Sequence, residues 1–131
     1  MAKYKYTTEF EVNASVNMLY PYFSTATGLK EWFADDVNME SEKKFVFEWQ
    51  GELKPARMVI KRTNQHVKFQ FDPVNEADEH DLAYVEFKMD YNELTQSTFI
   101  KVIDYSEMDD EIELDEMWGQ FFDDLKKQVG A

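Results

Sequence analysis

Apolar residues near the C-terminal end of the chain recur at steps of three and four. Between Asp109 and Val129 the positions with this spacing are Leu114, Met117, Trp118, Phe121, Phe122, Leu125 and Val129. An α-helix completes a turn every 3.6 residues, so these side chains share one face. The segment therefore predicts a long amphipathic helix.

Most of the preceding chain instead alternates with period two, which is typical of strands that bury one face. The alternation is clear over residues 4–13 and returns over 37–39, 45–50, 52–63, 66–72, 82–91 and 95–105. Asn64 and Gln65 predict a hairpin turn, and Pro55 predicts an edge position or a bulge. The acidic segment 72–81 contains Pro73 and predicts a loop.

Two short apolar segments interrupt the alternation after the first predicted strand. The first follows a candidate N-cap, Asn13 or Ser15, and the second covers residues 28–33. The order predicts an α+β fold in a single domain over residues 1–131. It consists of a curved antiparallel sheet of about six to seven strands, two short helices after strand one, and a long helix across the sheet.

Composition narrows the function classes. Aromatic residues make up 16% of the chain, and cysteine is absent, which excludes disulfides and thiolate metal sites. The net charge of −13 disfavours nucleic acid and anionic lipid as partners, because both require neutralisation by Lys and Arg. No apolar stretch is long enough to insert into a membrane, and none resembles a signal segment, so we expect a cytoplasmic protein.

Acidic residues also crowd the start of the predicted C-terminal helix. They are Asp109, Asp110, Glu111, Glu113, Asp115 and Glu116. The helix dipole stabilises negative charge at this end, which accounts for the block without a function. The alternative is an acidic surface for a basic protein partner.

Catalytic and metal-binding signals are weak. No nucleophile elbow, phosphate-binding glycine loop or His-Glu-x-x-His motif is present, so we assign no catalytic residue and no cofactor. His66 opens a strand, where we expect a solvent-exposed position. Asp78, Glu79 and Asp81 surround His80 but lack the spacing of a calcium loop, so we assign no metal site. Glu48 and Glu86 are predicted on a solvated strand face opposite the aromatics.

Three motifs together carry a family resemblance. They are Leu19-Tyr20-Pro21-Tyr22-Phe23 through Leu29-Lys30-Glu31-Trp32-Phe33, the strand Thr98-Phe99-Ile100-Lys101-Val102, and the helix residues Trp118, Phe122 and Leu125. The chain resembles the START-like (SRPBCC) superfamily with its helix-grip fold. Within that superfamily it is similar to bacterial homologues of the heat-shock chaperone ATPase activator. The resemblance implies a cleft between the sheet and the last helix, which relatives use for lipids, polyketides or other apolar molecules.

We predict that aromatic and methionine side chains line this cleft. The candidates are Trp32, Phe45, Phe47, Trp49, Met58, Phe69, Phe87, Met117 and Phe121. The same side chains could instead simply fill the core.

Three functions stay open at this point. The first is a non-enzymatic binding module for an apolar small molecule, lipid-like or polyketide-like, in the cleft. The second is a protein-interaction or co-chaperone-like adaptor with a filled core. The third is a polyketide cyclase-like enzyme, for which Tyr6, Tyr84, Tyr91 and Tyr105 are the abundant polar candidates. The sequence does not predict an oligomeric state.

Overall fold

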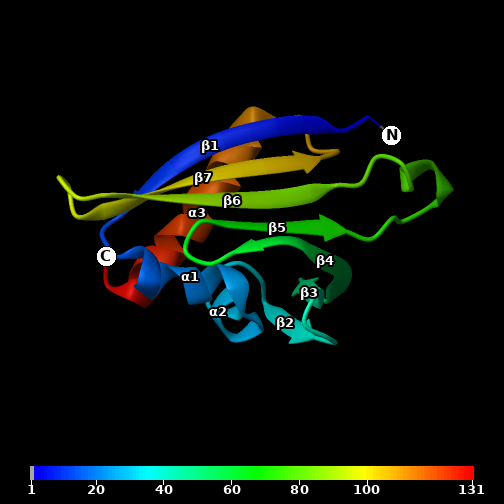
Figure 1. The fold of residues 1–131 in the computed structure, drawn as a ribbon. Coiled ribbons are helices and arrows are strands. Elements are labelled where there is room, and N and C mark those ends of the chain that lie inside the picture. Colours follow the sequence, from blue (N-terminus) through cyan, green and yellow to red (C-terminus); the bar gives the residue numbers. More distant parts are fainter. Residues whose placement is uncertain (1) are drawn as a thin grey trace.

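The computed structural model describes residues 2–131, which form a sheet with a long helix packed across one face (Figure 1). The elements in chain order are β1 (Tyr4–Val12), α1 (Val16–Ser24), α2 (Ala26–Lys30), β2 (Asp36–Met39), β3 (Lys44–Trp49), β4 (Glu52–Arg62), β5 (His66–Phe71), the 3₁₀ turn η1 (Glu76–Asp78), β6 (Tyr84–Asn92), β7 (Ser97–Ser106) and α3 (Glu111–Val129). The predicted fold class is confirmed.

The seven strands form one antiparallel sheet in the order β1-β7-β6-β5-β4-β3-β2. Strands β2 to β7 are neighbours in chain order, with a longer loop that contains η1 between β5 and β6, whereas β1 pairs with the distant β7. The two short helices bridge from β1 to β2 at the opposite edge (Figure 1). α1 packs on the same face of the sheet as α3, since the Phe23 ring lies 4.9 Å from Phe87 of β6 and 6.4 Å from Phe122 of α3.

α3 buries the face that its sequence period predicts. Leu114, Trp118, Phe122 and Leu125 are buried, and the Phe122 ring stacks on Phe10 of β1 with ring centroids 4.1 Å apart. Asp110 caps the helix by accepting hydrogen bonds from the backbone N–H groups of Ile112 and Glu113. The cap and the apolar face together explain why this segment is helical.

The second short helix begins earlier than the sequence predicts. α2 covers Ala26–Lys30 rather than residues 28–33, because the Thr25 hydroxyl caps it by accepting from Gly28 N at 2.9 Å. Gly28 packs directly on α1, where an added Cβ would lie 2.1 Å from Pro21 O. The prediction missed this cap and this close helix contact.

Pro55 lies in an interior strand, so the prediction of an edge position is wrong. β4 sits between β3 and β5, and the β4–β5 pairing ends at Ala56 and Phe71. Pro55 therefore falls just past the last pair, where the ladder with β5 requires no N–H from it. Its carbonyl accepts from Asp72 N at 3.0 Å. The bulge in β4 occurs further along, between Met58 and Ile60.

The predictions for His66 and Glu86 are also corrected. Glu86 lies on the sheet face opposite the aromatics, as predicted, but is only 9% exposed. His66 Nε2 contacts the Glu86 carboxylate across the β5–β6 ladder, and both side chains are largely covered. Side chains on adjacent strands cover part of the outer face. The alternation of apolar and polar residues within one strand does not predict this burial.

Candidate ligand-binding site

Most of the predicted lining residues lie in the interior between the sheet and α3. Trp32, Phe45, Phe47, Met58, Phe69 and Phe87 are all buried. Trp49, Met117 and Phe121 are partly buried and pack against this core. The structure thus brings the nine side chains to one side of the sheet, but it places them at different depths.

Aromatic rings fill the interior. Phe33 packs against Phe47 and Phe87 of the sheet with centroid distances of 5.5 and 5.9 Å, and it stacks on Trp118 of α3 at 5.7 Å. Phe47 in turn meets Phe69 at 5.3 Å. These are separations of rings in direct contact. The rings therefore occupy the centre of the cleft.

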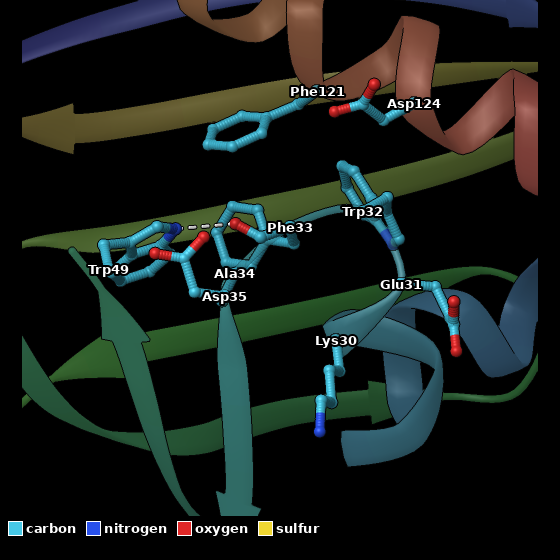
Figure 2. A pocket seen from close by; sticks show the side chains of 9 residues that line it. All are labelled: Lys30, Glu31, Trp32, Phe33, Ala34, Asp35, Trp49, Phe121 and Asp124. Carbon is cyan, nitrogen blue, oxygen red and sulfur yellow. Dashed lines mark hydrogen bonds between the residues drawn. The ribbon is translucent and has the colours of Figure 1, made fainter. Parts of the chain in front are cut away.

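Open space remains at the mouth of the cleft, where a depression of about 300 Å³ opens to solvent. It lies between the segment after α2, the end of β3 and the second half of α3 (Figure 2). The lining residues are Lys30, Glu31, Trp32, Phe33, Ala34, Asp35, Trp49, Phe121 and Asp124. Three predicted residues, Trp32, Trp49 and Phe121, reach this depression.

Hydrogen bonds hold the mouth in shape. Trp49 Nε1 donates to Phe33 O at 2.7 Å, as Figure 2 shows, and Trp32 Nε1 donates to Tyr22 O at 2.8 Å. Asp35 accepts from Gln50 N at 2.7 Å through its carboxylate. The bonds of Trp49 and Asp35 tie the segment after α2 to the end of β3, and the bond of Trp32 ties it to α1. Both tryptophan rings therefore have a fixed orientation.

Charged side chains surround the aromatic walls. Glu31, Asp35 and Asp124 contribute carboxylates, and Lys30 contributes one ammonium group. Lys30 Nζ lies 3.3 Å from Asp36 Oδ1, and this hydrogen bond holds the pKa of Asp36 below its usual value. The depression thus has an apolar floor and a polar, mainly acidic rim.

The sequence interpretation missed Phe33 and the rim residues. Phe33 directly follows Trp32, and neighbouring residues of a helix point in different directions. The chain leaves α2 at Lys30 and turns, which brings both rings into the cleft. The aromatic pair itself was visible in the sequence, but the turn that orients it was not.

Polar groups inside the fold hold α3 against the sheet. Trp118 Nε1 donates to Asp104 Oδ2 at 2.9 Å, and Tyr6 Oη donates to Asp115. Burial raises the pKa of Asp104, and burial together with the Asp115 hydrogen bond raises the pKa of Tyr6 to about 12. None of these side chains lines the depression.

The other tyrosines considered for chemistry lie elsewhere. Tyr84 and Tyr105 stack on each other at 5.2 Å on the outer face, and Tyr91 is exposed near the β6–β7 turn. Tyr20 is buried, and its hydroxyl has no hydrogen-bond partner within residues 2–131. The structure therefore does not gather these tyrosines into one site.

The acidic loop before β6 is held by contacts with the start of the chain and with β7. Lys3 Nζ binds Asp78 at 3.1 Å, and Tyr105 Oη donates to Asp81 Oδ1 at 2.7 Å. Across residues 2–131 no group of three or more His, Asp and Glu side chains is arranged to hold a metal ion. In the same part of the chain, no helix is both long enough and apolar enough to cross a membrane.

Comparison with known families identifies the fold family. A model of the START-like superfamily domain matches residues 1–131. The chain belongs to the START-like superfamily. The protein BfR322 from Bacteroides fragilis is 35% identical, with 98% of this chain and 92% of that chain covered and a TM-score of 0.64.

More distant structures share the START-like fold. The Aha1 dimer from Colwellia psychrerythraea is 18% identical over 96% of both chains, with a TM-score of 0.78. DynU16, a protein of the dynemicin biosynthetic locus, is 12% identical over 97% of this chain and 47% of that chain, with a TM-score of 0.76. No curated protein sequence matches this chain. At such low identity these two structures show the fold alone.

Proposed function

We propose that this START-like chain is a non-enzymatic binding module for an apolar small molecule, which it holds at the mouth of the cleft. The supporting observation is the depression itself, which is lined by the half-buried Trp49 and Phe121 and by the buried Trp32. Ligand sites are typically concave and mostly apolar with a few placed polar groups. The aromatic floor supplies the apolar part of such a site, and polar and charged groups make up the larger share of the exposed lining.

The dimensions restrict the ligand. A depression of about 300 Å³ is at the lower end of the range for small-molecule sites. A ligand that penetrated further would have to displace Phe33, which is 3% exposed and contacts rings from both the sheet and α3. We therefore expect a compact apolar group, about one or two fused rings, between Trp49 and Phe121.

A neutral fluorescent probe tests this proposal. N-phenyl-1-naphthylamine carries no charge, so the acidic rim neither attracts nor repels it strongly. We expect saturable binding to the wild-type protein and a loss of about tenfold or more in affinity for Phe121→Asp, which places a carboxylate in the apolar wall. Ile112→Asp provides the matched control, because Ile112 lies on the same helix, is 72% exposed and is not part of the depression.

Two results would contradict the proposal. One is the absence of saturable binding to a folded wild-type protein. The other is an equal loss of affinity in both aspartate variants, which would mean that the probe responds to the charge of α3 and not to the depression.

The filled interior favours one alternative, a protein-interaction adaptor. Aromatic rings occupy the space that a lipid-sized ligand would need, which fits a module whose surface carries the function. In this case a partner's apolar side chain would occupy the same depression. Native mass spectrometry separates the two, because a bound small molecule adds a mass that denaturation releases.

A further inference from the structure

A row of basic side chains crosses four adjacent strands on the sheet face opposite α3. Arg62 of β4 pairs with His66 of β5, His66 pairs with Lys88 of β6, and Lys88 pairs with Lys101 of β7. Phe87 and Val67, the neighbours of Lys88 and His66 in sequence, point to the core instead. The row therefore lies on the outer surface of the sheet.

One pairing in this row is unfavourable in the isolated protein: Lys88 lies directly opposite Lys101, although Lys101 also lies opposite Glu9 of β1. Like charges directly opposite on neighbouring strands destabilise a sheet. Acidic residues outnumber Lys and Arg by 27 to 14, so carboxylate partners are plentiful in the chain. Yet Arg62, Lys88 and Lys101 form no ion pair within residues 2–131, where only His66 of the row has a carboxylate partner, Glu86.

A second depression, of about 430 Å³, lies over part of this row. Its lining residues are Arg62, Gln65, His66, Lys88, Met89 and Asp90. Its lining residues come from the turn between β4 and β5 and from the neighbouring part of β6, and none of them lines the aromatic depression. Two permanent cations and a histidine thus converge on one concave surface, together with a single carboxylate.

We infer that this depression binds a small phosphate-bearing molecule. The guanidinium of Arg62 can hold two phosphate oxygens at once, and Lys88 supplies a compact second charge. Neighbouring strands lie about 4.8 Å apart, so the backbones of Arg62 and Lys88 are roughly 10 Å apart. Both side chains are long enough to reach two linked phosphate groups between them. The acidity of the whole chain opposes long polyanions, whereas a compact anion meets mainly the local basic surface.

Glu86 positions the histidine for this role. Its carboxylate contacts His66 Nε2 and fixes the imidazole ring. With Nε2–H donating to Glu86, Nδ1 donates to a phosphate oxygen when the ring is protonated. Asp90 is the one acidic side chain in the lining and opposes an anion. The site consequently contains two cations that attract phosphate and a carboxylate whose removal should improve binding.

Titration with inorganic pyrophosphate tests the inference. Binding is measured by isothermal titration calorimetry and by amide chemical shifts, at about 50 mM salt to limit screening. We expect one saturable site with shifts at residues 62–66 and 88–90. Arg62→Gln and Lys88→Gln should each weaken binding about tenfold, and Asp90→Asn should tighten it severalfold. Lys127→Gln makes the same change in net charge at an exposed position outside the depression and should leave binding unchanged.

Several results would overturn the inference. They are the absence of saturable pyrophosphate binding, an equal loss in Lys127→Gln, and shifts located away from the row. Citrate or a hexaglutamate peptide binding as tightly as pyrophosphate would also overturn it, in favour of a carboxylate ligand or an acidic protein partner. Circular dichroism of each variant verifies that the protein is folded.

Discussion

Replacing Trp118 with phenylalanine removes the hydrogen bond that joins α3 to Asp104 of β7. Trp118 is 1% exposed, and its Nε1 donates to Asp104 Oδ2 at 2.9 Å. Burial raises the pKa of Asp104, while hydrogen bonds from Trp118 and Ser106 act in the opposite direction. The variant leaves a largely buried carboxylate with one donor fewer.

Two contributions give the size of the effect. A hydrogen bond to a charged group contributes about 1.5–3 kcal/mol. The smaller phenylalanine ring also leaves a gap in the core, which costs about 2 kcal/mol at ~0.8 kcal/mol per missing methylene-sized group. We therefore expect Trp118→Phe to lower the free energy of unfolding by about 4 kcal/mol at pH 7, measured by urea denaturation.

Trp32→Phe is the matched control. Trp32 is 4% exposed, and its Nε1 donates to a neutral acceptor, Tyr22 O, at 2.8 Å. The loss of ring volume is the same, but a neutral hydrogen bond contributes only about 1 kcal/mol. We expect a loss of about 3 kcal/mol, so the difference of about 1 kcal/mol between the variants reports the charge on Asp104.

The pH dependence makes the test decisive. The folded-state pKa of Asp104 lies above its ordinary value of 3.8. The favourable contribution of Asp104 to the free energy of unfolding is therefore greatest below pH 3.8 and is lost as the pH rises through the folded-state pKa. Trp118→Phe raises that pKa further. The extra cost of Trp118→Phe over Trp32→Phe should therefore shrink as the pH is lowered from 7 towards 4. An extra cost that is absent at pH 7, or that does not change with pH, would refute the reasoning.

Three further predictions concern helix contacts, capping and ionisation. Gly28→Ala should destabilise the fold by several kcal/mol in urea denaturation, because the new Cβ would lie 2.1 Å from Pro21 O. In Gly119→Ala the new Cβ meets no heavy atom within 4 Å, so this variant should stabilise α3 by up to ~1 kcal/mol. The reverse order of stabilities would contradict the packing of α1 on α2. Asp110→Ala should lower the unfolding free energy by about 1 kcal/mol through loss of the N-cap, and Asp110→Asn should recover most of it. Tyr6, with a pKa of about 12, should be the last tyrosine to ionise in an ultraviolet absorbance titration. Its contribution to the free energy of unfolding should be present below pH 10.0 and lost as the pH rises towards 12. A titration curve that is unchanged in Tyr6→Phe would contradict this assignment.

The sequence by itself determined the element types and their order. The three-and-four spacing from Leu114 to Leu125 specifies which face of α3 is buried, and the period-two segments become β1 to β7. These patterns are local, because a helix or a strand must place its apolar side chains on one side to join a core. The prediction of an edge position for Pro55 was wrong because the position depends on where β5 ends. The predicted start of α2 was wrong because it depends on the Thr25 cap.

Only the tertiary structure decided which aromatic residues fill the core and which reach the surface. Phe47 and Trp49 lie on the same face of β3, two residues apart. Phe47 is nevertheless fully buried and Trp49 lines the open depression, because the strand ends at the rim of the cleft. The basic row is likewise invisible along the chain, since Arg62, His66, Lys88 and Lys101 become neighbours only through strand register. Periodicity specifies the direction of a side chain from its own element, whereas depth and neighbours depend on how distant elements pack.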